Sequence, residues 1–234
     1  YTSLGKKVPQ TFWISANTLS ITKNKDGELV FSCPSDTKFI DVYEKIFQIT
    51  WDDNIWHRVP ASVNREEEIE LFRQGHALFT DATCFQISNS RESNVDFGIV
   101  PYPKWDEAQD KYYSRIEGCE LFGIPKINKK PEMAGVILEA MACESMKSVI
   151  PAYYDVALKV KYTRDDDSAD MLDLAFENRV FDYGDTVLCE ELRDGFFRIA
   201  MAENNRNMAS GLAESASKVN SKLETFNAQL KSLS

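Results

Sequence analysis

The clearest alternation of apolar and polar positions in the chain runs from residue 95 to residue 99. Three apolar side chains there alternate with an aspartate and a glycine, and this period of two predicts a strand with one buried face. Pro101 and Pro103 follow, and each fixes φ and removes a backbone donor, so we expect the strand to end before them. Aromatic and acidic residues beyond them, beginning with Trp105, are typical of exposed chain. The pattern therefore indicates a passage of the chain between two bodies.

Four stretches repeat apolar residues every three or four positions and predict helices. They span residues 36–49, 64–75, 132–143 and 165–180. Asn64 is the expected N-cap of the second helix, and Gly75 is a favourable residue just beyond its end. We expect the acidic run Asp165–Asp167 to lie at the start of the fourth helix rather than to bind calcium. In the third helix, the residues expected to face inward are Met133, Val136, Ile137 and Ala140.

Shorter apolar runs predict strands. They cover residues 12–14, 29–31, 77–79 and 118–124. Asn24–Gly27 supplies a turn between the first two runs, and Pro125 ends the last one. The order of helix, glycine and strand around Gly75 favours an α/β fold class.

The last predicted helix carries apolar residues at alternating intervals of four and three. They are Leu212, Ala216, Val219, Leu223, Phe226, Leu230 and Leu233. This spacing is the heptad seam of a coiled coil over three repeats, which leaves open an interaction protein that dimerises through this helix. Because three repeats make a short coiled coil, we expect the helix to lay this stripe on its own domain instead.

The charge balance argues against one class of partner. The chain has 27 lysines and arginines against 37 aspartates and glutamates, a net charge of −10. Such a surface repels phosphate backbones, so we expect no nucleic-acid partner. No apolar run approaches the ~20 residues that a membrane-spanning helix needs. The five cysteines are odd in number and widely spaced, which argues against a disulfide framework or a zinc site and predicts small buried side chains.

Catalytic and metal-binding motifs are sparse in this sequence. His57 and His76 have no metal-ligand spacing to each other or to a cysteine, so we expect them to be surface residues or hydrogen-bonded polar residues, with no bound metal or cofactor. The sequence also lacks a nucleophile elbow, a phosphate-binding glycine loop and a zinc-protease helix motif. A carboxylate pair such as Asp81 with Glu120 leaves open a carbohydrate-active hydrolase fragment, because such enzymes hold two carboxyl groups about 5–10 Å apart.

Aromatic residues favour a binding function. They occur as adjacent pairs at positions 112–113, 153–154 and 196–197. Neighbours in a helix or strand cannot both point to one face, so one ring of each pair is expected to face a cleft, an interface or solvent. Aromatic rings beside carboxylates and hydroxyls suit a sugar, whose apolar faces stack on the ring while its hydroxyls bind the polar groups.

Several segments together resemble a known protein family. Residues 71–79, LFRQGHALF, are similar to the F-x-x-G-x-A-x-(M/F) segment of extracellular solute-binding proteins of ATP-driven importers, the class that includes maltodextrin-binding proteins. Residues 95–104 are similar to the G-x-x-P-x-P strand by which that family crosses its hinge. Later blocks of the family are matched, in the same order, by residues 124–126, the helix from Glu132, residues 151–155 and residues 164–173.

The resemblance implies a two-lobed α/β fold of the periplasmic-binding-protein type II, which closes like a clamshell over its ligand. It implies capture of an extracellular solute, with a carbohydrate expected, and delivery to the membrane permease of an ATP-binding-cassette importer without catalysis. It also implies a cell-surface lipoprotein whose signal peptide and anchor lie upstream of this chain. The ligand-binding residues that it implies are Phe79, Asp81, Phe85, Tyr112, Tyr113, Phe196 and Phe197.

Proteins of that family are about twice as long as this chain, because each of their two lobes has an ordinary domain size. We therefore expect the C-terminal half of a binding protein, lacking most of the first lobe. Residues 1–100 would belong to the second lobe, residues 101–160 to the hinge crossing and a partial first lobe, and residues 161–234 to the return to the second lobe. Residues 104–150 are then expected to be less stable than the rest, or to lean on the second lobe or a neighbouring chain.

Overall fold

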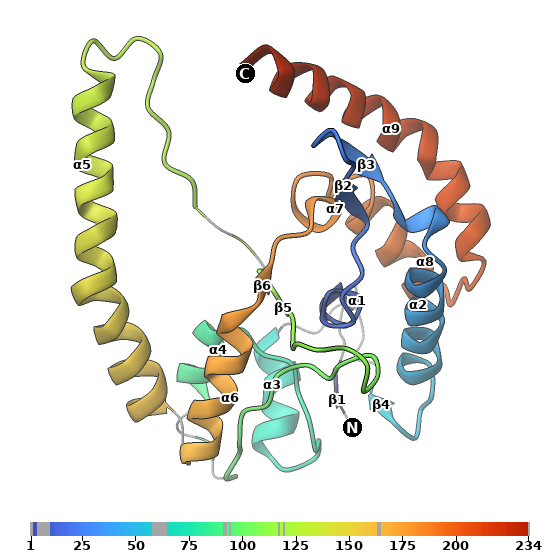
Figure 1. Ribbon diagram of the computed structural model, residues 1–234. Coiled ribbons are helices and arrows are strands. Elements are labelled where there is room, and N and C mark those ends of the chain that lie inside the picture. Colours follow the sequence, from blue (N-terminus) through green and yellow to red (C-terminus); the bar gives the residue numbers. More distant parts are fainter. Residues whose placement is uncertain are drawn as a thin grey trace. The chain divides into compact units, whose positions relative to one another are not determined.

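A computed structural model describes residues 2–3, 10–57, 65–90, 93, 95–116, 118, 120–162 and 165–233 of the chain. Helices predominate in it, and short strands accompany them (Figure 1). The predicted mixture of α and β structure is therefore confirmed.

The α-helices are α1 (Gln10–Ser15), α2 (Thr37–Thr50), α3 (Arg65–Arg73), α4 (Cys84–Asn89), α5 (Pro131–Glu144), α6 (Asp166–Glu177), α7 (Tyr183–Thr186), α8 (Arg198–Ala202) and α9 (Met208–Leu233). A 3-10 turn precedes α2 as η1 (Cys33–Ser35), and three π-helical segments are η2 (Ser145–Val149), η3 (Ala152–Tyr162) and η4 (Arg193–Phe197). Among the described residues, the strands form three separate pairs. Parallel pairs join β1 (Thr2–Ser3) to β4 (Trp56–His57) and β5 (Ser114–Arg115) to β6 (Arg179–Val180), and the antiparallel pair joins β2 (Ile21–Lys23) to β3 (Leu29–Phe31).

The chain divides into two compact units. Unit 1 comprises residues 1–81, 101–117 and 174–234, and unit 2 comprises residues 82–100 and 118–173. The chain thus passes from one unit to the other four times, between residues 81 and 82, 100 and 101, 117 and 118, and 173 and 174. The two-lobed clamshell and the three-part division of the chain stay predictions.

The core of unit 1 is built around a cluster of aromatic rings. Trp13 of α1, Phe39 and Tyr43 of α2, and Phe197 of η4 are almost fully buried, and the ring centroids of this cluster lie 4.9–6.2 Å apart. Such separations are favourable for aromatic pairs, which gain stability beyond the area that they bury. The predicted helix at residues 36–49 is confirmed as α2, and Asp36 caps it by accepting a hydrogen bond from the backbone N–H of Phe39.

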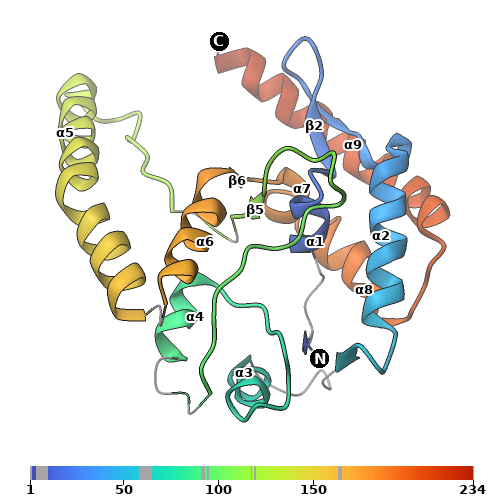
Figure 2. The ribbon, with the colours of Figure 1, turned by 60° about the horizontal axis from the view of Figure 1, so that its bottom comes forward.

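Helix α9 covers this core with the apolar stripe that the sequence predicts. Leu212, Val219 and Leu223 are buried within it, so packing of the stripe on its own domain is confirmed. The Asn227 side chain in α9 accepts a hydrogen bond from the N–H of Leu29 and donates one to the carbonyl of the same residue, at 2.9 and 3.0 Å. The helix thereby continues onto the β2–β3 hairpin, as Figures 1 and 2 show.

A buried carboxylate ties three elements of unit 1 together. Asp182, which is 1% exposed, accepts hydrogen bonds from Trp13 Nε1 (3.1 Å), from the N–H and hydroxyl of Ser20 (3.3 and 2.8 Å) and from the N–H of Gly184 (2.9 Å). Burial raises the pKa of Asp182, and these hydrogen bonds partly offset the rise. A Cβ atom on Gly184 would lie 2.0 Å from Ser20 Oγ, so the close approach of the two segments requires glycine here.

Unit 2 buries far less of its apolar surface. Among the described residues, its buried apolar side chains are Ile87, Leu158 and Leu172, and Ser168 Oγ accepts a hydrogen bond of 2.8 Å from the N–H of Ile99. Helix α5 forms where the sequence predicts it, but none of its residues is buried. The expectation that Met133, Val136, Ile137 and Ala140 face a core is therefore wrong for the described chain.

Several predicted strands are absent from the described residues. Residues 12–14 lie in helix α1, because a short apolar run fits a buried helix as well as a strand. Residues 77–79 and the described part of 118–124 are irregular, and Leu78, Leu121 and Phe122 are exposed. Residues 95–99 alternate between half-buried and exposed, as predicted, but no described strand pairs with them. A strand needs a hydrogen-bonded neighbour, which apolar patterning alone does not supply.

The histidines and cysteines give a mixed outcome. His57 and His76 are exposed, as expected. Cys33 is buried, which confirms one prediction, but Cys143 is exposed, and Asn64 and Cys119 lie outside the described residues. All four described cysteines are free thiols. Over the described residues, no helix is long and apolar enough to cross a membrane.

We expect replacement of Asp182 by alanine to destabilise unit 1 by about 3–5 kcal/mol, because the buried donors of Trp13 and Ser20 would lose their acceptor. Urea unfolding followed by tryptophan fluorescence measures this loss. Exposed Asp26→Ala is the matched control and should change the free energy of unfolding by no more than about 0.5 kcal/mol. Equal effects of the two substitutions would contradict the structural role of Asp182.

Candidate functional site

The candidate site is a hollow in unit 1 beside the loop from Lys104 to Tyr113. It has a volume of about 330 Å³. Its lining residues are Asn17, Lys38, Trp105, Asp106, Ala108, Gln109 and Asp110. The loop begins directly after Pro101 and Pro103, so the stiff segment that the sequence singles out leads into the hollow.

Gln109 anchors this loop to the body of unit 1. The residue is 7% exposed, and its Nε2 donates hydrogen bonds to the carbonyls of Ser15 (2.8 Å) and Lys111 (2.7 Å). Its Oε1 accepts a hydrogen bond of 3.2 Å from the N–H of Trp105. Because Ser15 ends helix α1, this one side chain fixes the loop to the same helix that supplies Trp13 to the core.

Asp106 shapes the turn at the rim of the hollow. Its Oδ1 accepts hydrogen bonds of 3.0 Å from the backbone N–H groups of both Ala108 and Gln109. An aspartate that binds backbone groups two and three residues later stabilises a turn. Over the residues that the structure describes, no hydrogen bond is donated to the second oxygen of this exposed carboxylate, which can accept one from a solute.

Trp105 is the aromatic residue in the lining of the hollow. Its side chain is 37% exposed, and the hollow also offers the carboxylates of Asp106 and Asp110 and the amine of Lys38. A ring face beside hydrogen-bonding groups of both kinds suits a polar molecule with apolar C–H faces, such as a sugar. The arrangement offers binding groups and no nucleophile paired with a base.

Two of the predicted ligand residues are the last two residues of this loop. Tyr112 and Tyr113 are half-buried. The Lys104 ammonium lies 4.8 Å from the centroid of the Tyr112 ring and 3.4 Å from the carbonyl oxygen of Asp110. A cation this close to a ring face is attracted to it by about 0.5–1 kcal/mol at an exposed site. The contact holds Tyr112 next to the hollow without placing it in the lining.

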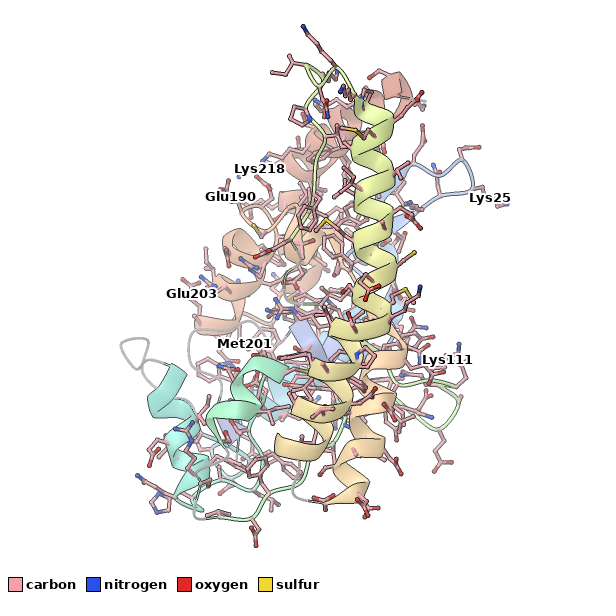
Figure 3. The ribbon with its side chains drawn as sticks, turned by 90° about the vertical axis from the view of Figure 1, so that its left-hand side faces the viewer. Lys25, Lys111, Glu190, Met201, Glu203 and Lys218 are labelled. Carbon is pink, nitrogen blue, oxygen red and sulfur yellow. The ribbon has the colours of Figure 1, made fainter. Side chains whose placement is uncertain are left out.

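A second hollow of unit 1, of about 350 Å³, lies between the η4–α8 segment and α9. Its lining includes Phe196, and Lys218 and Glu191 supply charge. Figure 3 labels Lys218 together with Glu190 and Met201. Glu191 is buried and forms ion pairs with Lys222 (2.5 Å) and Lys218 (3.9 Å). The hydrogen bond between Glu191 and Lys222 raises the pKa of this lysine. This charged group therefore already has partners within the protein.

The predicted ligand residues are not gathered in one place. Phe197 is 1% exposed and belongs to the aromatic core, so its prediction as a ligand residue is wrong. Phe196 is half-buried against that core and borders only the second hollow. Phe79 is 58% exposed, Asp81 is half-buried, and neither lines either hollow.

The remaining predictions rest on residues of unit 2. Phe85 lies in α4 of that unit, and its side chain is outside the described part of the structure. Asp81 belongs to unit 1 and Glu120 to unit 2, so the carboxylate pair of the hydrolase hypothesis stays a prediction.

The sequence predicts the exposed Trp105 of the hollow, but it does not predict Gln109, which anchors the loop. Trp105 stands out among the acidic residues that follow Pro103, so its exposure could be predicted. Gln109 could not be found in this way, because its importance depends on the Ser15 carbonyl, which is 94 residues away in sequence.

Over the described residues, no group of three or more histidine, cysteine, aspartate and glutamate side chains could hold a metal ion. No protein-family model matches the chain, and neither does any curated protein.

We expect Gln109→Leu to loosen the loop, because leucine has a similar size but cannot replace the three hydrogen bonds. The expected loss of stability is about 1–3 kcal/mol, from the backbone groups left without partners. Hydrogen exchange should become faster at the amides of residues 105–111 and stay unchanged at those of α2. Asp110→Asn, at the exposed neighbour, is the control. Unchanged exchange in Gln109→Leu would show that the loop is held by other contacts.

Proposed function

We propose that this chain belongs to an extracellular solute-binding protein that captures a carbohydrate and delivers it to an ATP-binding-cassette importer in the membrane. The protein acts by binding and hinge closure, without catalysis, and as a surface lipoprotein. Its small-molecule partner is a mono- or oligosaccharide, and its macromolecular partner is the permease of the importer. The observation that carries the proposal is the hollow at Trp105, where an exposed indole lies among carboxylates and an amine.

The chemistry of this hollow favours a sugar over other solutes. A sugar ring presents C–H groups that pack on an indole face, while its hydroxyls both donate and accept hydrogen bonds. Asp106 and Asp110 accept from hydroxyl donors, and Lys38 donates to ring or hydroxyl oxygens. An anionic solute would be repelled by the two carboxylates, and a purely apolar solute would leave these charged groups without partners.

The course of the chain supports hinge closure. Of the four passages between the units, one falls between Val100 and Pro101, next to the two prolines that restrict the backbone. The loop that lines the hollow follows within a few residues. Domain closure needs rigid bodies joined by short segments that absorb changes in φ and ψ. In this proposal the passage at Pro101 is such a segment.

A thermal-shift panel of mono- and oligosaccharides tests this function. A sugar at a hundred times its dissociation constant should stabilise the protein by about 2.7 kcal/mol. Trp105→Ala should reduce that shift by at least half, because it removes the stacking surface. Ile55→Ala, which removes another exposed apolar side chain of unit 1, is the control and should leave the shift unchanged.

The same panel separates the alternatives. If no sugar shifts the melting temperature and a peptide or polyamine does, the ligand class is wrong. If Phe79→Ala abolishes the shift and Trp105→Ala does not, the ligand lies at the residues implied by the family resemblance rather than in the Trp105 hollow. Release of shorter sugars during the incubation, lost in Asp81→Asn or Glu120→Gln, would favour the hydrolase.

A further inference from the structure

The second hollow of unit 1 has a buried carboxylate in its lining. Glu191 is 6% exposed, and it lines this space of about 350 Å³ between the η4–α8 segment and α9. Figure 3 labels Glu190, the neighbour of Glu191 in sequence, and Lys218 of α9, which mark the place of the hollow. Sites for small molecules have volumes of about 300–1,000 Å³, so this hollow has room for a small ligand.

One oxygen of Glu191 is available to such a ligand. Lys222 and Lys218 approach its Oε1, at 2.5 and 3.9 Å. Over the residues that the structure describes, no hydrogen bond is donated to its Oε2. An acceptor that is largely shielded from water is unfavourable without a donor, and a charged donor forms the strongest hydrogen bond with it. An ammonium group on a bound molecule would therefore fit this position.

Helix α9 adds charges of both signs to the hollow. Gly211, Glu214, Ser215 and Lys218 follow the spacing i, i+3, i+4, i+7, so they share one face of the helix, and all four line the hollow. Within the described part of the chain, no ion pair joins Glu214 to Lys218. The distance of 3.9 Å between Lys218 Nζ and Glu191 Oε1 is too long for a hydrogen bond. The lysine thus keeps donors for a negatively charged group of a ligand.

The η4–α8 segment supplies an apolar wall. Phe196, Ile199 and Ala200 line the hollow on this segment, and Ile199 is 49% exposed. The centroid of the Phe196 ring lies 5.2 Å from that of Phe197 in the core, and a Cβ atom on Gly211 would collide with the Phe196 ring. The ring is therefore held between the core and α9. A ligand loses less affinity on a wall that is already ordered than on one that it must order.

We propose that this hollow binds a free amino acid with a large apolar side chain. The ammonium group of the ligand donates hydrogen bonds to the carboxylates of Glu191 and Glu214, and its carboxylate accepts one from Lys218. Its side chain packs on Phe196 and Ile199. This binding goes beyond sugar capture and does not depend on it, because no residue lines both hollows.

Ligands with only part of this chemistry fit the lining less well. An organic amine without a carboxylate offers no acceptor to Lys218, and a fatty acid is repelled by the carboxylates of Glu191 and Glu214. A sugar would turn hydroxyls toward Ile199 and Ala200, whose side chains offer no hydrogen-bond partner. A zwitterion with an apolar side chain satisfies all three parts of the lining.

Isothermal titration calorimetry of the full chain with leucine and three analogues tests this proposal. We expect leucine to bind with one-to-one stoichiometry. Leucinamide lacks the carboxylate, 4-methylpentanoate lacks the ammonium group, and glycine lacks the apolar side chain. Each analogue should bind about tenfold more weakly than leucine or worse, because each loses one of the three contacts.

The substitution Lys218→Gln separates a ligand contact from a structural role. Lys218 is exposed, so the fold should persist. Leucine should bind about tenfold more weakly, whereas the affinity for leucinamide, which has no carboxylate to meet the lysine, should stay the same. Lys45→Gln, at an exposed lysine of α2, is the matched control and should leave both affinities unchanged.

Three results would overturn the proposal. The first is a lack of binding of both leucine and phenylalanine at millimolar concentrations. The second is equal affinity for leucine, leucinamide and 4-methylpentanoate, which would show that only an apolar surface is recognised. The third is an equal loss of affinity for leucine and leucinamide in Lys218→Gln, which would give this lysine a structural role. None of these results bears on sugar binding at Trp105.

Discussion

The fold of unit 1 depends on the buried carboxylate of Asp182. A charge in this position is unfavourable by itself, and burial raises its pKa, yet it accepts hydrogen bonds from α1, from the segment before β2 and from the start of α7. Trp13 and Ser20 are 169 and 162 residues away from Asp182 in sequence. The carboxylate therefore joins the beginning of the described chain to its last third, and the aromatic cluster can close around Trp13. The hollow at Trp105 depends on the same helix, because Gln109 donates a hydrogen bond to the carbonyl of Ser15 at the end of α1.

The two units differ in how they bury their apolar side chains. In unit 1, helices α2 and α9 each lay an apolar stripe on a shared core. In unit 2, the most apolar helix has no described partner. Burial of apolar surface is the main favourable contribution to folding, so a unit that leaves such a helix exposed has less to oppose its conformational entropy. Hence unit 2 is expected to be the less stable of the two.

The proposed function of this chain rests on a binding surface rather than on reactive groups. The hollow combines an indole and two carboxylates, on a loop that is held by one buried amide, with the amine of Lys38 in α2. This rigidity matters for binding, because a ligand that meets a preformed surface loses less affinity to ordering it. The second hollow has a comparable volume, but its most buried charge, Glu191, is paired with lysines of α9. For this reason the first hollow is the better candidate.

The sequence alone determined the local features of this protein. Apolar spacing placed α2, α5 and α9, Gly75 marked the end of α3, and Asn24–Gly27 marked the β2–β3 hairpin, because each of these signals acts between neighbouring residues. Tertiary structure decided what each element packs against. Phe197 went to the core instead of a ligand, residues 12–14 became a helix, and the stripe of α5 stayed exposed, because burial depends on which distant segments meet. Tertiary structure also decided the roles of Gln109 and Asp182. Both residues act through hydrogen-bond partners about a hundred residues or more away in sequence, and no local pattern encodes such partners.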